Sequence, residues 1–173
     1  MIAVRSSELI ADFVKAAALA GIQIPAADIE FVELPAPHRP PSSLPPGKLA
    51  VYVFMHGNRC LKVGKAGPKS AARYCSQHYG ANRAPSTLAR SLIKAQFGGS
   101  ALLDEANIAA WIRANTDRIN FLVPSNYGFA VLSLLEAFVQ CRLKPEFEGF
   151  ASQRAVTQPG TPAERPQKAV AVR

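Results

Sequence analysis

The sequence has no aspartate or glutamate between Leu34 and Leu103, although this stretch contains ten lysines and arginines. The whole chain of 173 residues has a formal net charge of +8, and the gap in the acids concentrates the positive charge in its middle. The surface of an ordinary soluble protein mixes charges of both signs. A long basic stretch without acids therefore favours a polyanionic partner, most simply a nucleic acid.

Cysteine is scarce, and long apolar runs are missing. The three cysteines, Cys60, Cys75 and Cys141, are odd in number, widely spaced and without a CxxC pair. This spacing predicts neither a disulfide framework nor a zinc ribbon. No stretch approaches the ~20 apolar residues of a membrane-spanning helix, and acids interrupt the apolar N-terminal stretch, unlike in a secretion signal. We therefore expect reduced thiols, a soluble cytoplasmic protein and no membrane partner.

Nearly half of the residues are apolar, which is enough for a core, and the length of 173 residues predicts one domain with appendages. Residues 1–34 are expected to be an N-terminal helical segment, with an amphipathic helix over 7–20. Residues 35–47 contain six prolines and are interpreted as a stiff linker. Residues 48–149 form the predicted core domain. Residues 150–173 have the composition of a disordered basic tail.

The core domain is predicted to mix helices and strands, which is an α+β class. A β-hairpin over about 48–64 turns at Gly57, and the alternating pattern of 117–124 indicates a third strand. Helices are expected in the intervening stretches 68–79, 85–97 and 104–115. A long helix follows over 127–145, and Pro145 ends it.

Within this core, Glu136 is the only acid between Asp117 and Glu146, and helical spacing places it at the edge of an apolar face. A half-buried carboxylate needs a cation, a hydrogen-bond network or a metal. A salt bridge to a neighbouring lysine or arginine and a metal site both stay open at this point.

The hairpin and the helix after it carry further polar residues that suit phosphate chemistry. Tyr52 and Lys62 are placed symmetrically about Gly57, which predicts that they are cross-strand neighbours on one face of the hairpin. A lysine beside the phenol favours the phenolate, which can take a proton from water. Arg73 has a planar fork that matches phosphate oxygens. Each of these side chains also has an ordinary structural explanation on a solvated surface.

The order of these residues resembles the GIY-YIG nuclease superfamily. Ala50-Val51-Tyr52 stands where the first motif of the family ends in tyrosine, and Lys62-Val63-Gly64 stands where its second motif lies. Arg73 falls at the arginine of the first helix, His78 near the family's His/Tyr position, and Glu136 at the metal-binding glutamate. The resemblance covers about residues 48–149.

The resemblance implies a small three-stranded antiparallel sheet flanked by helices and the hydrolysis of DNA phosphodiester bonds with one divalent metal. Glu136 would hold Mg²⁺ or Mn²⁺, Tyr52 aided by Lys62 would deprotonate the attacking water, and Arg73 would stabilise the phosphate. His78 would position water or contact the phosphate. Five further basic residues would follow the DNA backbone: Lys65, Lys69, Arg83, Arg90 and Lys94.

Two departures from the family pattern leave alternatives open. Lys62 replaces the tyrosine of the second motif, as in some restriction-endonuclease members, and this favours Tyr52 as the base. The family's asparagine after the last helix has no clear match, and Glu148 lies nearest. A catalytically impaired DNA-binding module of the same fold is therefore one alternative. A protein-interaction adaptor that uses the proline-rich linker is another.

Overall fold

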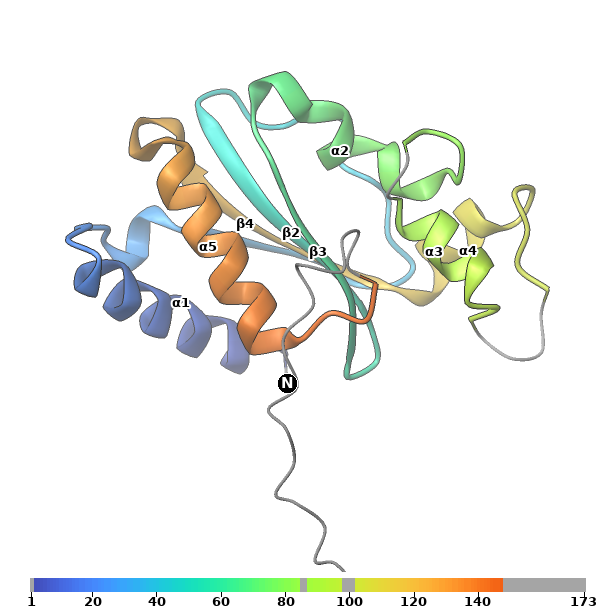
Figure 1. Cartoon of the computed structure of the whole chain (residues 1–173), viewed down its shortest axis with the longest axis horizontal. Coiled ribbons are helices and arrows are strands. Elements are labelled where there is room, and N and C mark those ends of the chain that lie inside the picture. Colours follow the sequence, from blue (N-terminus) through green and yellow to red (C-terminus); the bar gives the residue numbers. More distant parts are fainter. Residues whose placement is uncertain (1, 85–86, 98–101, 148–173) are drawn as a thin grey trace, which may run out of the picture.

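The computed structural model describes residues 2–84, 87–97 and 102–147, with side chains from Ser7 onward. The fold is one antiparallel sheet with helices packed on both of its faces (Figure 1). The strands are β1 (Glu30–Leu34), β2 (Lys48–His56), β3 (Arg59–Ala66) and β4 (Asp117–Pro124). The helices are α1 (Ile2–Leu19), α2 (Ala71–Cys75), α3 (Leu88–Lys94), α4 (Ile108–Asn115) and α5 (Gly128–Leu143).

The α+β class is confirmed, but the predicted number of three strands is wrong. The described residues form four strands in the order β1-β4-β2-β3, and every neighbouring pair is antiparallel. The additional strand β1 comes from the segment 1–34, for which only a helix was predicted. It is short and half-buried, and it pairs along its length with β4, from Glu30 opposite Leu122 to Leu34 opposite Arg118. Its own five residues hardly alternate, so only this partner specifies it as a strand.

Both faces of the sheet are covered, which makes the strands β2 and β4 buried along nearly their whole length. One face, with Val51, Val53 and Phe121, packs against α1 and α5. The other face, with Tyr52 and Phe54, packs against the chain from α2 to α4. A strand that is buried on both faces has a continuous apolar run, as in Ala50–Phe54.

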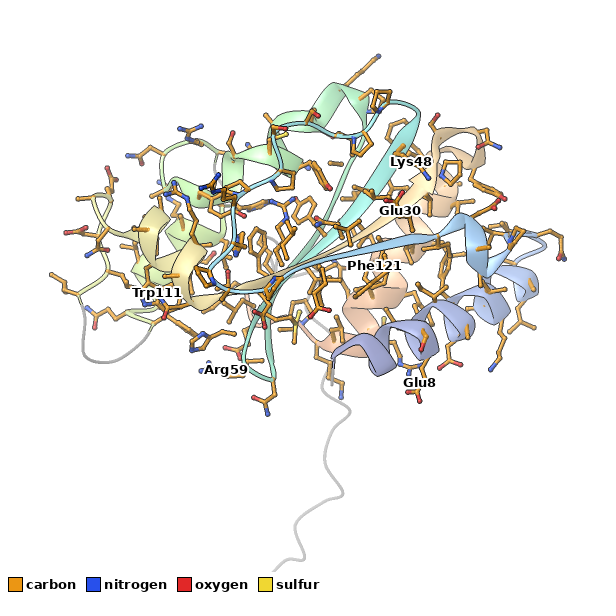
Figure 2. All side chains as sticks on the ribbon, turned by 180° about the vertical axis from the view of Figure 1, so that it is seen from behind. Glu8, Glu30, Lys48, Arg59, Trp111 and Phe121 are labelled. Atoms are coloured by element: carbon orange, nitrogen blue, oxygen red, sulfur yellow. The ribbon has the colours of Figure 1, made fainter. Side chains whose placement is uncertain are left out.

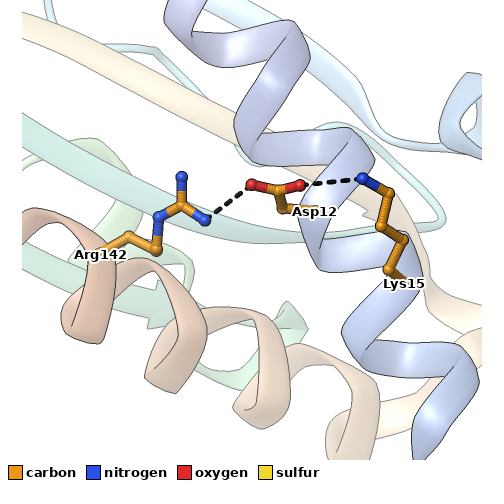
Figure 3. Close-up of polar contacts among 3 residues, drawn as sticks. All are labelled: Asp12, Lys15 and Arg142. Atoms are coloured by element: carbon orange, nitrogen blue, oxygen red, sulfur yellow. Dashed lines mark hydrogen bonds and ion pairs between the residues drawn. The ribbon is translucent and has the colours of Figure 1, made fainter.

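Helices α1 and α5 lie side by side on their face of the sheet (Figure 1). Phe13, which is fully buried, meets Phe138 edge to face with ring centroids 5.7 Å apart. At the surface Asp12 accepts a hydrogen bond from Arg142 at 2.7 Å and another from Lys15 at 3.2 Å (Figure 3). Arg142, and then Lys15, lower the pKa of the exposed Asp12 carboxyl. Apolar packing holds this pair of helices, because exposed ion pairs contribute little.

Two ion pairs lie at the ends of the sheet, one between two of its strands and one between the hairpin turn and the chain after α5. Lys48 of β2 lies 3.6 Å from Glu30 of β1 and so bridges the two strands that flank β4 (Figure 2). At the hairpin turn Arg59 forms a two-pronged contact with Glu146, with N–O distances of 2.7 and 2.6 Å. The amides of Glu146 and Phe147 donate to carbonyls of Cys60 and Leu61. The chain after α5 is therefore bound along the hairpin end of β3.

The segments around the sheet and the two long helices were also the subject of sequence predictions. The helix predicted over 68–79 is α2 flanked by two short 3-10 turns, Pro68–Ser70 and Gln77–Tyr79. Within the proline-rich stretch, His38 is buried and its amide donates to the carbonyl of Arg113. The tail predicted for 150–173 lies outside the described residues. Among the helices of the described residues, none is long and apolar enough to cross a membrane.

Candidate active site

Tyr52 and His78 form the centre of the candidate site. Tyr52 lies on β2, the strand between β3 and β4, and its hydroxyl oxygen is 2.7 Å from Nε2 of His78. His78 belongs to the 3-10 turn that follows α2. Only 2% of Tyr52 and 4% of His78 are exposed. This hydrogen bond is therefore shielded from bulk water.

The backbone next to His78 determines which ring nitrogen carries its proton. The amide N–H of Leu88, the first residue of α3, donates to Nδ1 at 3.2 Å, so Nδ1 is the unprotonated acceptor. Burial lowers the pKa of His78 to about 3, so the ring is neutral at neutral pH and its single proton lies on Nε2. Nε2 therefore donates to the Tyr52 oxygen. A donor at that oxygen favours the phenolate over the phenol.

Three cations surround this pair. The charges of Lys62, Arg118 and Arg73 add to burial in lowering the pKa of His78. Arg118 is fully buried and Lys62 is 5% exposed, whereas Arg73 on α2 faces solvent. Over the described parts of the chain, none of the ion pairs includes Arg73 or Arg118. Of the three cations, Arg73 is the one that a solvent-borne anion can reach directly, and the two buried cations add positive potential behind it.

The register of the hairpin differs by two residues from symmetry about Gly57, since Tyr52 lies opposite Gly64 and Lys62 opposite Phe54. One residue of this difference comes from the turn, in which His56 pairs with Arg59, so that its centre lies between Gly57 and Asn58. The other comes from an irregularity between Phe54 and Met55 that adds a residue on the β3 side. Tyr52 and Lys62 are therefore not directly opposite each other. They still share one face of the sheet as diagonal neighbours, since Tyr52 and Phe54 are two residues apart. The Lys62 ammonium donates to the carbonyl of Phe147 at 3.1 Å.

Gly64 leaves the space that the end of the Tyr52 ring occupies. A Cβ at position 64 would lie 2.5 Å from the Tyr52 hydroxyl oxygen and 2.7 Å from Cζ. The end of the phenol ring therefore lies directly over the Gly64 backbone on the edge strand β3. Glycine at position 64 therefore has a steric reason, which is the close approach of the Tyr52 ring.

Under the nuclease hypothesis of the sequence analysis, replacing Gly64 with alanine is expected to lower plasmid nicking by about 100-fold, because the methyl group displaces the Tyr52 hydroxyl from its position beside His78. The unfolding free energy should fall by only about 1–3 kcal/mol, as for other overpacked sites. Nicking rates and urea unfolding of both proteins check this. Gly80→Ala is the control, since its Cβ meets only the long Arg83 side chain, at 3.0 Å or more. Equal loss in both variants would contradict the steric role of Gly64.

Glu136 reaches the same edge strand from the other face of the sheet. Its Oε2 accepts a hydrogen bond from Lys65 at 2.6 Å, and the Glu136 side chain is only 14% exposed. Lys65 lies opposite Val51, on the face covered by α5. Because Gly64 and Lys65 are consecutive, the Tyr52 hydroxyl and the Glu136 carboxylate flank β3 from opposite faces. The salt bridge that the sequence left open is thus present.

Magnesium or manganese binding at Glu136 stays a prediction. Mg²⁺ commonly binds through one or two carboxylates and keeps several water ligands. Lys65 engages one carboxylate oxygen, Oε2, so Oε1 remains for a metal. The described residues contain no group of three or more His, Cys, Asp or Glu side chains that would form a fuller ligand set. Glu148, the predicted second acid, lies outside the described residues.

The five residues expected to follow the DNA backbone do not form one uniform set. Lys69, Arg83, Arg90 and Lys94 are exposed, on the turn before α2, the loop after it and α3. Arg90 and Lys94 are four residues apart on α3 and so share a side of it. Lys65 differs, because it is only 35% exposed and pairs with Glu136. DNA contact by these residues stays a prediction.

Sequence reasoning missed a second layer of polar groups beneath the site. Arg118 and Asn120 on β4 are fully buried, and Asn120 lies directly opposite Tyr52. Arg118 donates to the hydroxyl of Tyr79 at 3.3 Å. Tyr79 is in turn 2.7 Å from Nε2 of His38. The alternation in the strand 117–124 was the only available signal, because it puts Arg118 and Asn120 on the same face.

The neutral state of His78 predicts how stability depends on pH. An unfolded histidine takes up a proton below about pH 6.5, whereas folded His78 does so only near 3, so acid favours the unfolded state across this window. His78→Gln should reduce the slope of unfolding free energy against pH by about 1.4 kcal/mol per pH unit. Urea unfolding of both proteins between about pH 7 and 4 measures the slopes.

Part of the slope should persist in that variant, because burial also lowers the pKa of His38. Equal slopes in wild type and His78→Gln would contradict the neutral, buried His78.

Comparison of the chain with family models, curated proteins and solved structures found no match.

Proposed function

We propose that this chain is a divalent-metal-dependent DNA endonuclease of the GIY-YIG type. The observation that carries the proposal is the buried Tyr52–His78 hydrogen bond, in which the tyrosine oxygen is the acceptor. Around it lie three cations, Lys62, Arg73 and Arg118, of which the family resemblance singled out the first two. Some restriction-endonuclease members of the superfamily likewise have a lysine in the second motif beside the tyrosine of the first.

In this proposal Tyr52 is the general base. His78 is kept neutral and donates to the phenol oxygen, so the oxygen retains a donor after its proton leaves. Lys62 and Arg118 lower the cost of the negative charge on the phenolate. The phenolate takes a proton from the attacking water, a step that contributes about 10²–10⁴-fold in other enzymes.

Arg73 stabilises the phosphate on which negative charge develops. It lies on α2 next to the site and faces solvent without an ion-pair partner in the described residues. A guanidinium suits this role because its fork matches two phosphate oxygens. Lys69, Arg83, Arg90 and Lys94 contribute to binding along the DNA backbone, which makes the affinity fall steeply with salt.

Glu136 would hold the metal through Oε1, from the face of β3 opposite to Tyr52. A bound Mg²⁺ or Mn²⁺ would supply charge stabilisation at the scissile phosphate and the leaving oxygen. The substrate phosphate would then lie at the outer edge of β3, which side chains from both faces of the sheet can reach. Lys65, which lies on β3, fixes the orientation of the Glu136 carboxylate through their ion pair.

The test is incubation of the purified protein with supercoiled plasmid and Mg²⁺ or Mn²⁺, with and without a chelator. Linear and branched substrates are included because the substrate structure is open. Metal-dependent nicking by wild type and none by Glu136→Ala supports the proposal. Absence of nicking on every substrate and with both metals would overturn it.

A catalytically impaired DNA-binding module of the same fold is the second candidate. The ion pair between Lys65 and Glu136 favours it, because a lysine ammonium competes with a metal for the carboxylate. In that case wild type and Glu136→Ala would bind DNA equally and neither would cut. Metal-dependent cutting by wild type excludes this candidate.

A further inference from the structure

Arg118 is among the largest fully buried side chains of the protein, with none of its surface exposed. Its guanidinium donates to three neutral acceptors. Nε donates to the Asn120 side-chain oxygen at 3.0 Å, Nη1 to the Tyr79 hydroxyl at 3.3 Å, and Nη2 to the carbonyl of Tyr74. None of these acceptors is a carboxylate. The full positive charge therefore remains in the interior.

Aromatic rings surround this charge. The guanidinium carbon lies 4.8 Å from the ring centroid of Tyr74, 5.3 Å from that of Phe54 and 5.6 Å from that of Tyr52. Ring faces attract a cation but do not neutralise it. An arginine in a protein does not lose its proton, so the charge persists at every working pH. A buried charge is costly unless a partner compensates it.

Three buried tyrosines contact Arg118, and they differ in the hydrogen bonds at the hydroxyl. Tyr79 lies beside His38, whose Nδ1 must donate to the Thr116 carbonyl, so Nε2 of the neutral ring accepts the Tyr79 proton. Burial raises the pKa of both Tyr79 and Tyr74, and the charge of Arg118 acts against this effect. The oxygens of Tyr79 and Tyr52 each accept a hydrogen bond, from Arg118 and from His78 respectively.

We propose that Arg118 is a positioning residue for the nuclease chemistry, which favours the Tyr52 phenolate from beneath the ring and fixes the helix that carries Arg73. The second effect follows from its bond to the carbonyl of Tyr74, the residue directly after Arg73 on α2. The inference rests on the proposed function for its role in catalysis. Its electrostatic part concerns Tyr52 itself and is measurable without DNA.

Other groups also face Tyr52 and share its electrostatic environment. Lys62 lies diagonally on β3, Asn120 opposite on β4 and His78 at the hydroxyl, and Arg73 acts from α2. Of the three cations, Arg118 is the most deeply buried, so solvent and salt screen it least. We therefore expect its removal to have an effect that salt does not abolish.

The first experiment is an ultraviolet titration of tyrosine ionisation in wild type, Arg118→Gln and Arg118→Lys. Each is compared with the same protein carrying Tyr52→Phe, so that the difference isolates Tyr52 among the four tyrosines. In Arg118→Gln the Tyr52 phenolate should form at a pH higher by about one unit or more, and Arg118→Lys should stay close to wild type. Equal titration in all three proteins would overturn the proposal, as would equal shifts in the glutamine and lysine variants.

Arg118→Gln leaves acceptors unpaired in the core and is at risk of not folding. Asn120→Asp is therefore titrated as well, since it keeps Arg118 in place and puts a carboxylate on its Nε. Asn120 Nδ2 has no hydrogen-bond partner among the described residues, so replacing it with an oxygen atom breaks no hydrogen bond there. The Tyr52 phenolate should again form at higher pH. An unchanged Tyr52 titration in Asn120→Asp would overturn the proposal without any Arg118 variant.

The pH dependence of nicking separates this inference from the proposed function. If wild type nicks DNA, the acidic limb of its pH–rate profile should lie at higher pH in Arg118→Gln, by the same amount as the shift of the Tyr52 titration. In Arg118→Lys the limb should lie close to its wild-type position. Nicking with an unmoved limb would overturn the Arg118 inference and leave the nuclease proposal standing. If wild type never nicks while the Tyr52 titration shifts as expected, the nuclease proposal fails and the effect of Arg118 on Tyr52 stands.

Discussion

Tyr52→Phe is expected to reduce metal-dependent nicking by about 1,000-fold, as the loss of a general base does in other enzymes. The change removes one oxygen atom and keeps the ring, which packs against Phe54 and His78 with centroid distances of 6.2 and 5.1 Å. His78 Nε2 loses its acceptor, so the unfolding free energy should fall by about 1–3 kcal/mol. Initial rates of plasmid nicking and urea unfolding measure the two effects.

Tyr127→Phe is the matched control for this change. It removes the same atom from a tyrosine that bonds to Asp28, on the side of the sheet covered by α1 and α5. Its nicking rate should stay within about twofold of wild type, as expected of a residue outside the chemistry. If Tyr52→Phe kept more than about a tenth of wild-type activity, Tyr52 would not be the base.

Glu136→Gln is expected to abolish nicking at ordinary metal concentrations, with a fall of at least about 1,000-fold. An amide keeps the shape of the side chain but lacks the charge that attracts a divalent cation. The DNA affinity measured without metal should not fall, because the substitution removes a negative charge from a basic protein. Nicking as a function of Mn²⁺ concentration, together with DNA binding in chelator, tests both statements.

Lys65→Met distinguishes a metal ligand from a structural ion pair. The ammonium at 2.6 Å competes with the metal for the Glu136 carboxylate, so its removal should lower the metal concentration needed for half-maximal nicking by several-fold. If Glu136 served only as the partner of Lys65, the two variants would lose the same activity. Parallel losses in Glu136→Gln and Lys65→Met would therefore contradict the metal role.

Much of the core of the fold follows from local pattern. The predicted strand 117–124 has the bounds of β4, and the hairpin and the long last helix lie where the apolar spacing puts them. These elements have strong, continuous apolar signals. Strand β1 escaped prediction because its five residues are half-buried and only their partner β4 makes them a strand.

The sequence proposed a set of candidate site residues but could not predict their arrangement. Counting from Gly57 makes Tyr52 and Lys62 symmetric, whereas a turn centred between Gly57 and Asn58 and one irregularity in the hairpin together put Gly64 opposite Tyr52. A one-residue irregularity depends on how the strand fits its neighbours, which local sequence does not encode. The sequence also did not indicate which cation pairs with Glu136. The packing of α5 against β3 brings Glu136 to Lys65.

The sequence by itself determined that this protein has a basic middle, an antiparallel hairpin with Tyr52 and Lys62 on it, and a lone acid on the last helix. Only the tertiary structure decided that Arg118 belongs beneath Tyr52. In a strand with alternating polarity, polar positions such as Arg118 and Asn120 normally face water. Here the chain from α2 to α4 covers that face, and aromatic rings and neutral acceptors enclose the charge. Alternation within one strand cannot reveal such a cover, because the residues that form it lie elsewhere in the chain.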